Sequence, residues 1–255
     1  AFAQKVGDNY NPEVGFARRS GYERGSLNIR RQFYPNASRF QRLSPIVGLD
    51  FFQNELNGTT DSELRVGFEG QGLNTSRFNA SLVRNYIYLF SDFDPTREGN
   101  QVLPEGSDHT FVNFEASYNS DTRNEFFYTA RTTMGEYFNG DRFSFGGNIN
   151  YRFQPYGIAS IDYNYNRVRL PDPYGDADIF LIGPRFDITF SKKLFWTTFI
   201  QYNSQIDNIN INSRLQWRFK PVSDIFIAYT DNYFPDNLIN KNRALVIKAT
   251  YWLNL

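Results

Sequence analysis

The sequence has no cysteine, a single histidine and a single methionine, and it has no excess of charge of either sign. Without cysteine there can be no disulfide, no thiolate metal site and no cysteine nucleophile. Lys+Arg number 27 and Asp+Glu number 27, so electrostatics give no reason to expect a nucleic-acid partner. The longest apolar runs, such as residues 225–229, are far shorter than the roughly 20 residues of a membrane-spanning helix. These absences exclude a helical membrane protein.

Aromatic residues are abundant in a chain that is hydrophilic on average. Phe, Tyr and Trp make up 18% of the residues, yet 21% are charged and the mean hydropathy is −0.54. Disordered chains are poor in aromatics, so this composition indicates a folded protein. The rings and the charges must therefore be separated within the fold.

The apolar residues recur at every second position. Between Asn208 and Phe219 the odd positions are mostly apolar, whereas the even positions carry only Asn, Gln and Arg. The same alternation covers residues 63–69 and 143–153, and apolar side chains share one face from Leu245 to the end of the chain. A period of two predicts strands with one apolar and one polar face. No comparable stretch shows the helical period of 3.6.

Extending this pattern along the chain predicts a series of long strands and a short apolar stub at 2–6. Most of these strands exceed the usual length of about 5–6 residues, which favours a large barrel. The predicted ranges are 23–34, 40–54, 62–71, 76–90, 110–121, 124–134, 142–153, 157–168, 178–190, 193–205, 208–219, 224–232 and 243–255.

The predicted connections alternate in length. Short ones are expected at 35–39, 72–75, 122–123, 154–156, 191–192 and 220–223, and longer ones at 7–22, 55–61, 91–109, 135–141, 169–177 and 233–242, with a tight link at Asp207 as the exception. Short turns on one side and long loops on the other are typical of outer-membrane barrels. We therefore predict an all-β fold, a transmembrane antiparallel up-and-down β-barrel of about 14 or more strands, forming a single domain over 1–255.

In such a barrel the apolar face meets outer-membrane lipid and the polar face lines the lumen. A cluster of lumen charges is predicted toward one end of neighbouring strands, comprising Arg152, Asp162, Arg185, Asp187, Arg214 and Arg218. Rings of charge can select ions or bind anionic ligands, whereas a ladder of structural ion pairs would merely fill the interior. Both interpretations remain open from the sequence.

Aromatic side chains at the two membrane interfaces are a further expectation for a barrel. We predict that a belt near the short turns contains Trp196, Trp217, Phe153, Phe190 and Tyr251. Trp252 is expected to face the lumen by parity and is not counted in the belt.

Chemical motifs are sparse. Ser107, Asp108 and His109 are consecutive, so they cannot adopt the geometry of a catalytic triad with one another. Asp172, Asp176 and Asp178 offer oxygen ligands, but they lack the twelve-residue spacing of a calcium loop. We therefore expect no catalytic residue, no metal site and no cofactor, and the chain is not expected to be an enzyme.

A resemblance rests on two segments at the ends of the chain. The segment from Lys5 to Arg19, with the Asn-Pro-Glu-Val-Gly-Phe block beginning at Asn11, and the closing segment from Lys248 to Leu255 are similar to an uncharacterised outer-membrane family of the Bacteroidetes type. In that family a periplasmic module similar to carbohydrate-binding family nine precedes a large C-terminal barrel. The resemblance implies that 1–255 is the C-terminal part of a longer protein. It implies no catalytic residues.

Three functions follow as expectations. The first is a pore or uptake channel in the outer membrane of a Gram-negative bacterium, with a polar, charged lumen. The second is an anchoring component of an outer-membrane complex with a plugged lumen, in which other envelope proteins are partners. The third is a soluble carbohydrate-binding β protein. Aromatic rings that face lipid argue against the third function, and resistance of the folded protein to extraction without detergent would settle it.

Overall fold

A computed structural model describes residues 1–15, 19–36 and 39–253. Residues 16–18 of the N-terminal block, and Asn254 and Leu255 of the closing segment, lie outside the described part.

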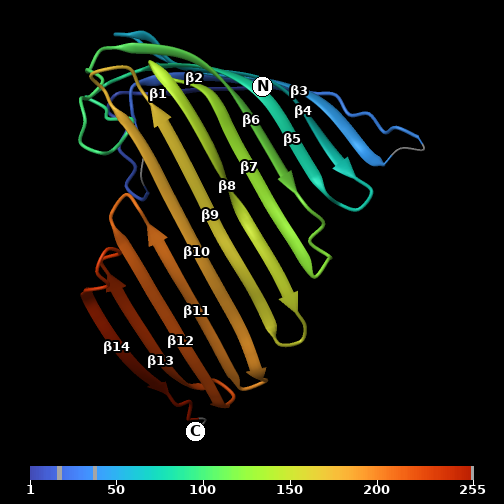
Figure 1. Ribbon diagram of the computed structural model, residues 1–255. Helices are drawn as coiled ribbons and strands as arrows, with labels where there is room; N and C mark the ends of the chain where they lie inside the picture. The colour runs from blue at the N-terminus through green and yellow to red at the C-terminus, as the bar shows by residue number, and fades with distance from the viewer. Residues whose placement is uncertain (16–18, 37–38, 254–255) are drawn as a thin grey trace. The chain divides into compact units, whose positions relative to one another are not determined.

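The described residues form fourteen strands, shown in chain order in Figure 1. Their bounds are β1 (Phe2–Val6), β2 (Tyr22–Arg30), β3 (Phe40–Asn54), β4 (Gly58–Gly72), β5 (Arg77–Tyr88), β6 (Asp108–Asn119), β7 (Phe126–Tyr137), β8 (Gly140–Phe153), β9 (Gly157–Arg169), β10 (Asp176–Ser191), β11 (Leu194–Asn203), β12 (Asn208–Lys220), β13 (Ser223–Tyr233) and β14 (Asn240–Thr250). Within the described ranges, no helix is long and apolar enough to cross a membrane.

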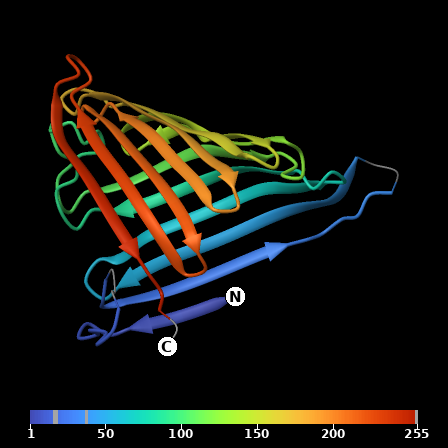
Figure 2. The ribbon, with the colours of Figure 1, turned by 90° about the horizontal axis from the view of Figure 1, so that it is seen from below.

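All fourteen strands belong to one sheet, and their order in the sheet is their order in the chain, from β1 to β14. Neighbouring strands pair antiparallel, as in the consecutive strands β12, β13 and β14 at the red end of Figure 2. The predicted all-β, antiparallel, up-and-down fold is therefore confirmed. The up-and-down order needs only hairpin connections, which suits strands whose two faces differ in polarity.

Contacts divide the chain into two compact units. Unit 1 contains 1–118, 131–144 and 167–177, and unit 2 contains 119–130, 145–166 and 178–255. Strands β7, β8 and β9 each contribute one end to unit 1 and the other end to unit 2.

Several predicted boundaries are wrong at strand ends. The predicted strand 23–34 ends at Arg30, and beyond it Phe33 forms only an isolated bridge to Leu43. The last strand ends at Thr250 rather than 255, so the parity argument that pointed Trp252 to the lumen does not apply. The stub at 2–6 is confirmed as β1, which pairs with β2. Alternation alone marks the middle of a strand well and its ends poorly.

The predicted alternation of loop lengths holds only in part. The connections at 89–107 and 7–21 are long, but those at 55–57 and 138–139 are tight turns where longer loops were expected. Asn54 Oδ1 accepts the Asn57 backbone N–H at 2.6 Å and Gly58 has φ of 66°, which closes the first turn. Phe138 has φ of 53° in the second. The polar residues Thr59–Asp61 look like a loop in the sequence because both faces of β4 are polar there.

Candidate functional site: the polar face of the sheet

The two faces of the sheet differ sharply in unit 1. Leu49 lies opposite Leu64, and Val47, Val66 and Leu82 form a row across β3, β4 and β5. These side chains are exposed, Val66 by 51% and Leu82 by 59%. We call this the apolar face and the opposite one the polar face.

Unit 2 repeats the arrangement. Trp196, Leu215, Ile227 and Ile247 form one row across β11 to β14, and Ile247 is 65% exposed. Exposed side chains on the apolar face of the described strands also include Leu27, Ile29, Leu64, Val112, Phe143, Phe145, Ile149, Tyr151, Ile161, Phe180, Phe186, Ile200, Trp217 and Leu245. Soluble monomers rarely expose contiguous apolar patches beyond about 300–600 Å², whereas each unit by itself exposes apolar side chains on several neighbouring strands.

The predicted charge cluster is assembled in part on the polar face of unit 2. Arg185 donates through Nε to Asp187 Oδ2 at 2.7 Å, and Thr197 Oγ1 donates to the other carboxylate oxygen at 2.7 Å. Arg214 lies in the same row, opposite Thr197. Asp162, on β9, accepts a hydrogen bond from Asn148 Nδ2 at 2.8 Å.

The other two predicted members have separate partners. Arg218 pairs with Asp224 at 3.3 Å and stands 5.7 Å from the Phe195 ring centre, close to the turn at 221–222. Arg152 lies over the Phe127 ring at 5.1 Å. Among the described residues Arg214 has no ion-pair partner and is exposed, so it is the member of the set most available to a passing anion.

A second set of charges lies on the polar face of unit 1 and was not part of the predicted charge cluster. Arg65 on β4 pairs with Glu63 at 3.1 Å and with Glu115 on β6 at 2.7 Å. Its bridge to β6 passes over β5, where Val83 lies opposite Arg65 and is only 1% exposed. The side-chain stem therefore covers an apolar residue while the head group joins two carboxylates.

Further pairs extend this set. Arg24 binds Asp50 through two hydrogen bonds, Nε at 2.9 Å and Nη2 at 2.5 Å, and Arg30 binds Glu69 at 3.1 Å. The alternation placed these residues on the polar face, but only register shows which charges meet. Their pairing favours the structural interpretation for unit 1, since two-point arginine–carboxylate contacts fix side chains in place.

The predicted belt residues lie near the turns 154–156, 192–193 and 221–222. Trp217 and Phe190 are about half exposed, while Trp196 is less exposed and donates from Nε1 to Ser213 Oγ at 2.8 Å. Phe153 stacks with Tyr151 at 6.4 Å between ring centres. Tyr251, just beyond β14, stacks with Phe219 at 6.3 Å.

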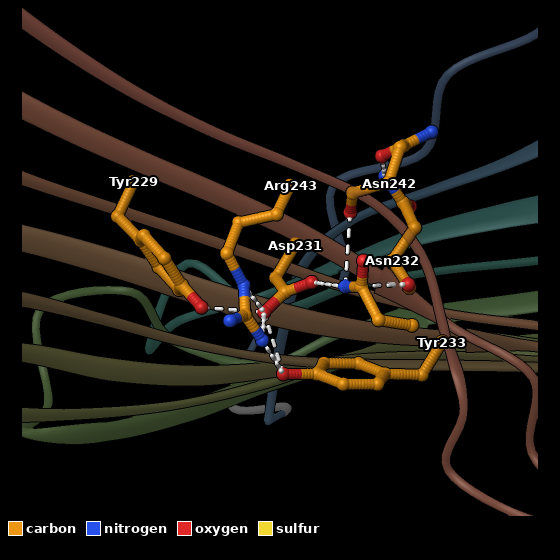
Figure 3. Close-up of polar contacts among 7 residues, drawn as sticks. Tyr229, Asp231, Asn232, Tyr233, Asn242 and Arg243 are labelled. Atoms are coloured by element: carbon orange, nitrogen blue, oxygen red, sulfur yellow. Dashed lines mark hydrogen bonds and ion pairs between the residues drawn. The ribbon is translucent and has the colours of Figure 1, made fainter.

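Charged residues also occur on the apolar face, which the alternation did not anticipate. Asp231 lies opposite Ile211 and Arg243, near the end of β13 (Figure 3). Its carboxylate is fully buried and accepts hydrogen bonds from Tyr229, Tyr233 and Asn240, and from Arg243 Nε at 2.9 Å. Every oxygen of the buried charge is thus paired, which is the condition for holding it there. The sequence signal that could have revealed this cluster is the spacing of Tyr229, Asp231 and Tyr233, which are two residues apart and so share one face of β13.

A compact cap lies at the other end of unit 1 from the turn at 73–76. The connection 89–107 is held by a bridge between Phe93 and Leu103, and Leu103 is 1% exposed. Phe93 packs against Phe138 at 5.1 Å between ring centres, and Phe138 contacts Phe111 at 5.4 Å. Of the eight buried apolar residues in the described part of the chain, six lie in or beside such connections, namely Leu89, Leu103, Phe111, Val168, Leu170 and Ala177.

Asp94 organises the cap. Its carboxylate accepts the Thr96 N–H at 2.8 Å, the Thr96 hydroxyl at 2.6 Å and the Gly99 N–H at 3.0 Å. Burial opposes ionisation of Asp94, but these hydrogen bonds outweigh it and hold the pKa of the carboxyl below its usual value. Thr96 is fully buried, so the loop has a fixed local structure.

The sequence motifs considered for chemistry have ordinary partners. Ser107 Oγ donates to the Pro104 carbonyl at 2.6 Å and lies 3.1 Å from His109 Nε2, a contact whose direction is set by the tautomer of the imidazole. Asp176 pairs with Arg169 at 3.4 Å, and Asp178 accepts from Tyr165 at 2.6 Å. The described residues contain no group of three or more metal-ligating side chains.

Comparison with known proteins gave no match among family models, curated proteins or solved structures.

Proposed function

We propose that this chain forms an outer-membrane β-barrel whose apolar face meets lipid and whose polar face lines a water-filled pore in a Gram-negative cell envelope. The observation that carries the proposal is the exposure of the apolar face in both units, opposite a face of paired charges. In water such a face would promote aggregation. In a bilayer the acyl chains contact these apolar side chains in place of other acyl chains, so the face is not exposed to water.

The backbone supports the same proposal. A sheet can cross a bilayer only when every strand has a neighbour on both sides, because lipid offers no hydrogen bonds to an open edge. An up-and-down sheet of an even number of strands with hairpin connections is the arrangement that closes in this way. Strands such as β3, β4, β8 and β10 exceed the roughly 9–11 residues that a span requires.

Passage of ions is tested by reconstituting the purified protein in planar bilayers. A pore gives defined single-channel current steps, and Arg214→Glu shifts the ratio of anion to cation permeability because Arg214 is exposed on the polar face. Arg167→Glu is the matched control, since Arg167 is exposed and shares the parity of the apolar-face residue Ile161 on β9. Unchanged selectivity in Arg214→Glu would remove this arginine from the pore.

A second function, a plugged scaffold that anchors other envelope proteins, is favoured by the cap. Phe111 and Glu115 are four residues apart on β6, so both side chains lie on its polar face. Phe138 of the cap contacts Phe111, which brings the cap over the polar face of that strand. Replacing 92–105 by a short Gly-Ser linker separates the two functions. If the wild type gives no current steps and the linker variant does, the plugged scaffold is supported. If both proteins give current steps, the open pore is supported.

A further inference from the structure

Three of the lysines of the chain meet at two neighbouring turns. Lys192 and Lys193 form the connection between β10 and β11, and Lys220 ends β12 just before the turn at 221–222. The remaining lysines, Lys5, Lys241 and Lys248, lie elsewhere in the chain. The protein as a whole has no net charge, so these turns are a local concentration of positive charge.

A groove of about 750 Å³ lies between the two turns. It is lined by Lys192, Lys193, Arg218, Phe219, Lys220, Pro221, Val222 and Asp224. The four cations face one carboxylate, and Asp224 is already engaged by Arg218 at 3.3 Å and by Gln216 Nε2 at 3.0 Å. Asp224 therefore neutralises the arginine and leaves the charge of the three lysines uncompensated among the lining residues.

The groove is held in shape before any ligand binds. The Arg218 backbone N–H donates to the Lys193 carbonyl at 2.7 Å, which ties the two turns together. A register shift between Arg218 and Lys220 turns the end of β12. Lys220 Nζ donates to the Tyr251 hydroxyl at 2.9 Å and stands 5.0 Å from the ring centre, so its position is fixed by a neutral partner.

Aromatic side chains border the groove on the side of the apolar face. Phe219 stacks with Tyr251 at 6.3 Å and contacts Trp217 at 5.7 Å between ring centres. Trp217, Tyr251 and the nearby Phe190 are each about half exposed. Rings of this kind lie at the head-group level of a bilayer, with acyl chains on one side and water on the other.

We propose that this groove binds the phosphate of a phospholipid with an anionic head group. The lysine ammonium groups supply the charge, and the exposed rings contact the first methylenes of the acyl chains. The proposal rests on the proposed membrane location. The rings select a lipid over a free anion, because a free phosphate offers nothing to contact them.

The test is native mass spectrometry of the detergent-solubilised full chain titrated with dioleoylphosphatidylglycerol and with dioleoylphosphatidylcholine. The wild type is expected to bind phosphatidylglycerol on the order of a hundredfold more tightly, since each of the three lysines beside an anionic lipid contributes on the order of a fivefold preference. Lys192→Gln/Lys193→Gln/Lys220→Gln is expected to lose this preference. Lys5→Gln/Lys241→Gln/Lys248→Gln removes the same charge elsewhere and is expected to keep it.

Several results would overturn the proposal. Equal binding of the two lipids by the wild type, or equal loss in both triple variants, would show that no site exists at these turns. Displacement of the bound lipid by millimolar inorganic phosphate would assign the groove to free anions. If the Lys220 substitution prevents folding, Lys192→Gln/Lys193→Gln provides the same comparison with turn residues alone. A protein that enters bilayers but shows no lipid preference refutes only this inference, while failure to enter bilayers refutes the proposed function.

Discussion

Removing the Arg65 guanidinium should measurably weaken unit 1. Arg65→Met keeps the stem that covers Val83 but removes the contacts to Glu63 at 3.1 Å and to Glu115 at 2.7 Å. The Arg65 side chain is 26% exposed and that of Glu115 is 33% exposed. The pair is therefore intermediate between fully exposed and fully buried ion pairs. Exposed pairs contribute about 0–1 kcal/mol and loss of one partner of a fully buried pair costs about 3–5 kcal/mol. We therefore expect a loss of about 2 kcal/mol.

The assay is urea unfolding from lipid vesicles, followed by tryptophan fluorescence, with Glu115→Gln completing a double-mutant cycle. The coupling between Arg65 and Glu115 is expected to be about 1 kcal/mol, because Arg65 retains Glu63 when Glu115 is neutralised. Arg30→Met is the control, since Arg30 is 41% exposed and makes one contact of 3.1 Å to Glu69. A loss below about 0.5 kcal/mol in Arg65→Met, or one equal to that of Arg30→Met, would refute the reasoning.

Three further predictions concern the apolar face and the cap. Leu82→Arg on the apolar face of β5 should cost about 2–4 kcal/mol in vesicles, whereas Asn85→Arg, opposite Glu63 on the polar face, should cost little; equal costs would contradict the assignment of faces. Leu103→Ala should destabilise the cap by about 2–5 kcal/mol and admit protease to 89–107, while its exposed neighbour Val102→Ala should leave cleavage unchanged. The lowered pKa of Asp94 means that its contribution is complete above the unfolded value of about 3.9 and is lost as pH falls through the lower folded value. Amide exchange at Thr96 and Gly99, corrected for intrinsic rates, should therefore be constant from pH 7 to 5 and accelerate below about pH 4, and Asp94→Asn should remove that pH dependence.

Much of the fold could be predicted because alternation is a property of each strand by itself. The apolar set of Ile209, Ile211, Leu215 and Trp217 predicted β12 correctly, and register confirms that they share one face. The tight turns at 55–57 and 138–139 were missed although each ends in an Asn-Gly pair, Asn57-Gly58 and Asn139-Gly140, which is the usual signal of a hairpin turn. The polar residues around them look like longer loops in the sequence.

The charged contacts were less predictable because they depend on register across strands. Arg65 and Glu115 are far apart in the sequence and meet only because β5 places Val83 between them. Asp231 was overlooked because a charge on an apolar face looks like an interruption of the pattern, while in the structure its tyrosine and arginine partners make it part of that face. The cap follows from ring contacts around Phe138 that no spacing rule describes.

The most direct test of the membrane barrel is the accessibility of spin labels placed one at a time along β12, from residue 211 to residue 217, in lipid vesicles. The barrel predicts that oxygen collisions are highest at 211, 213, 215 and 217 and that a water-soluble nickel chelate collides most at 212, 214 and 216, because register alternates the two faces. Uniform access of the nickel chelate at all of these positions would contradict it.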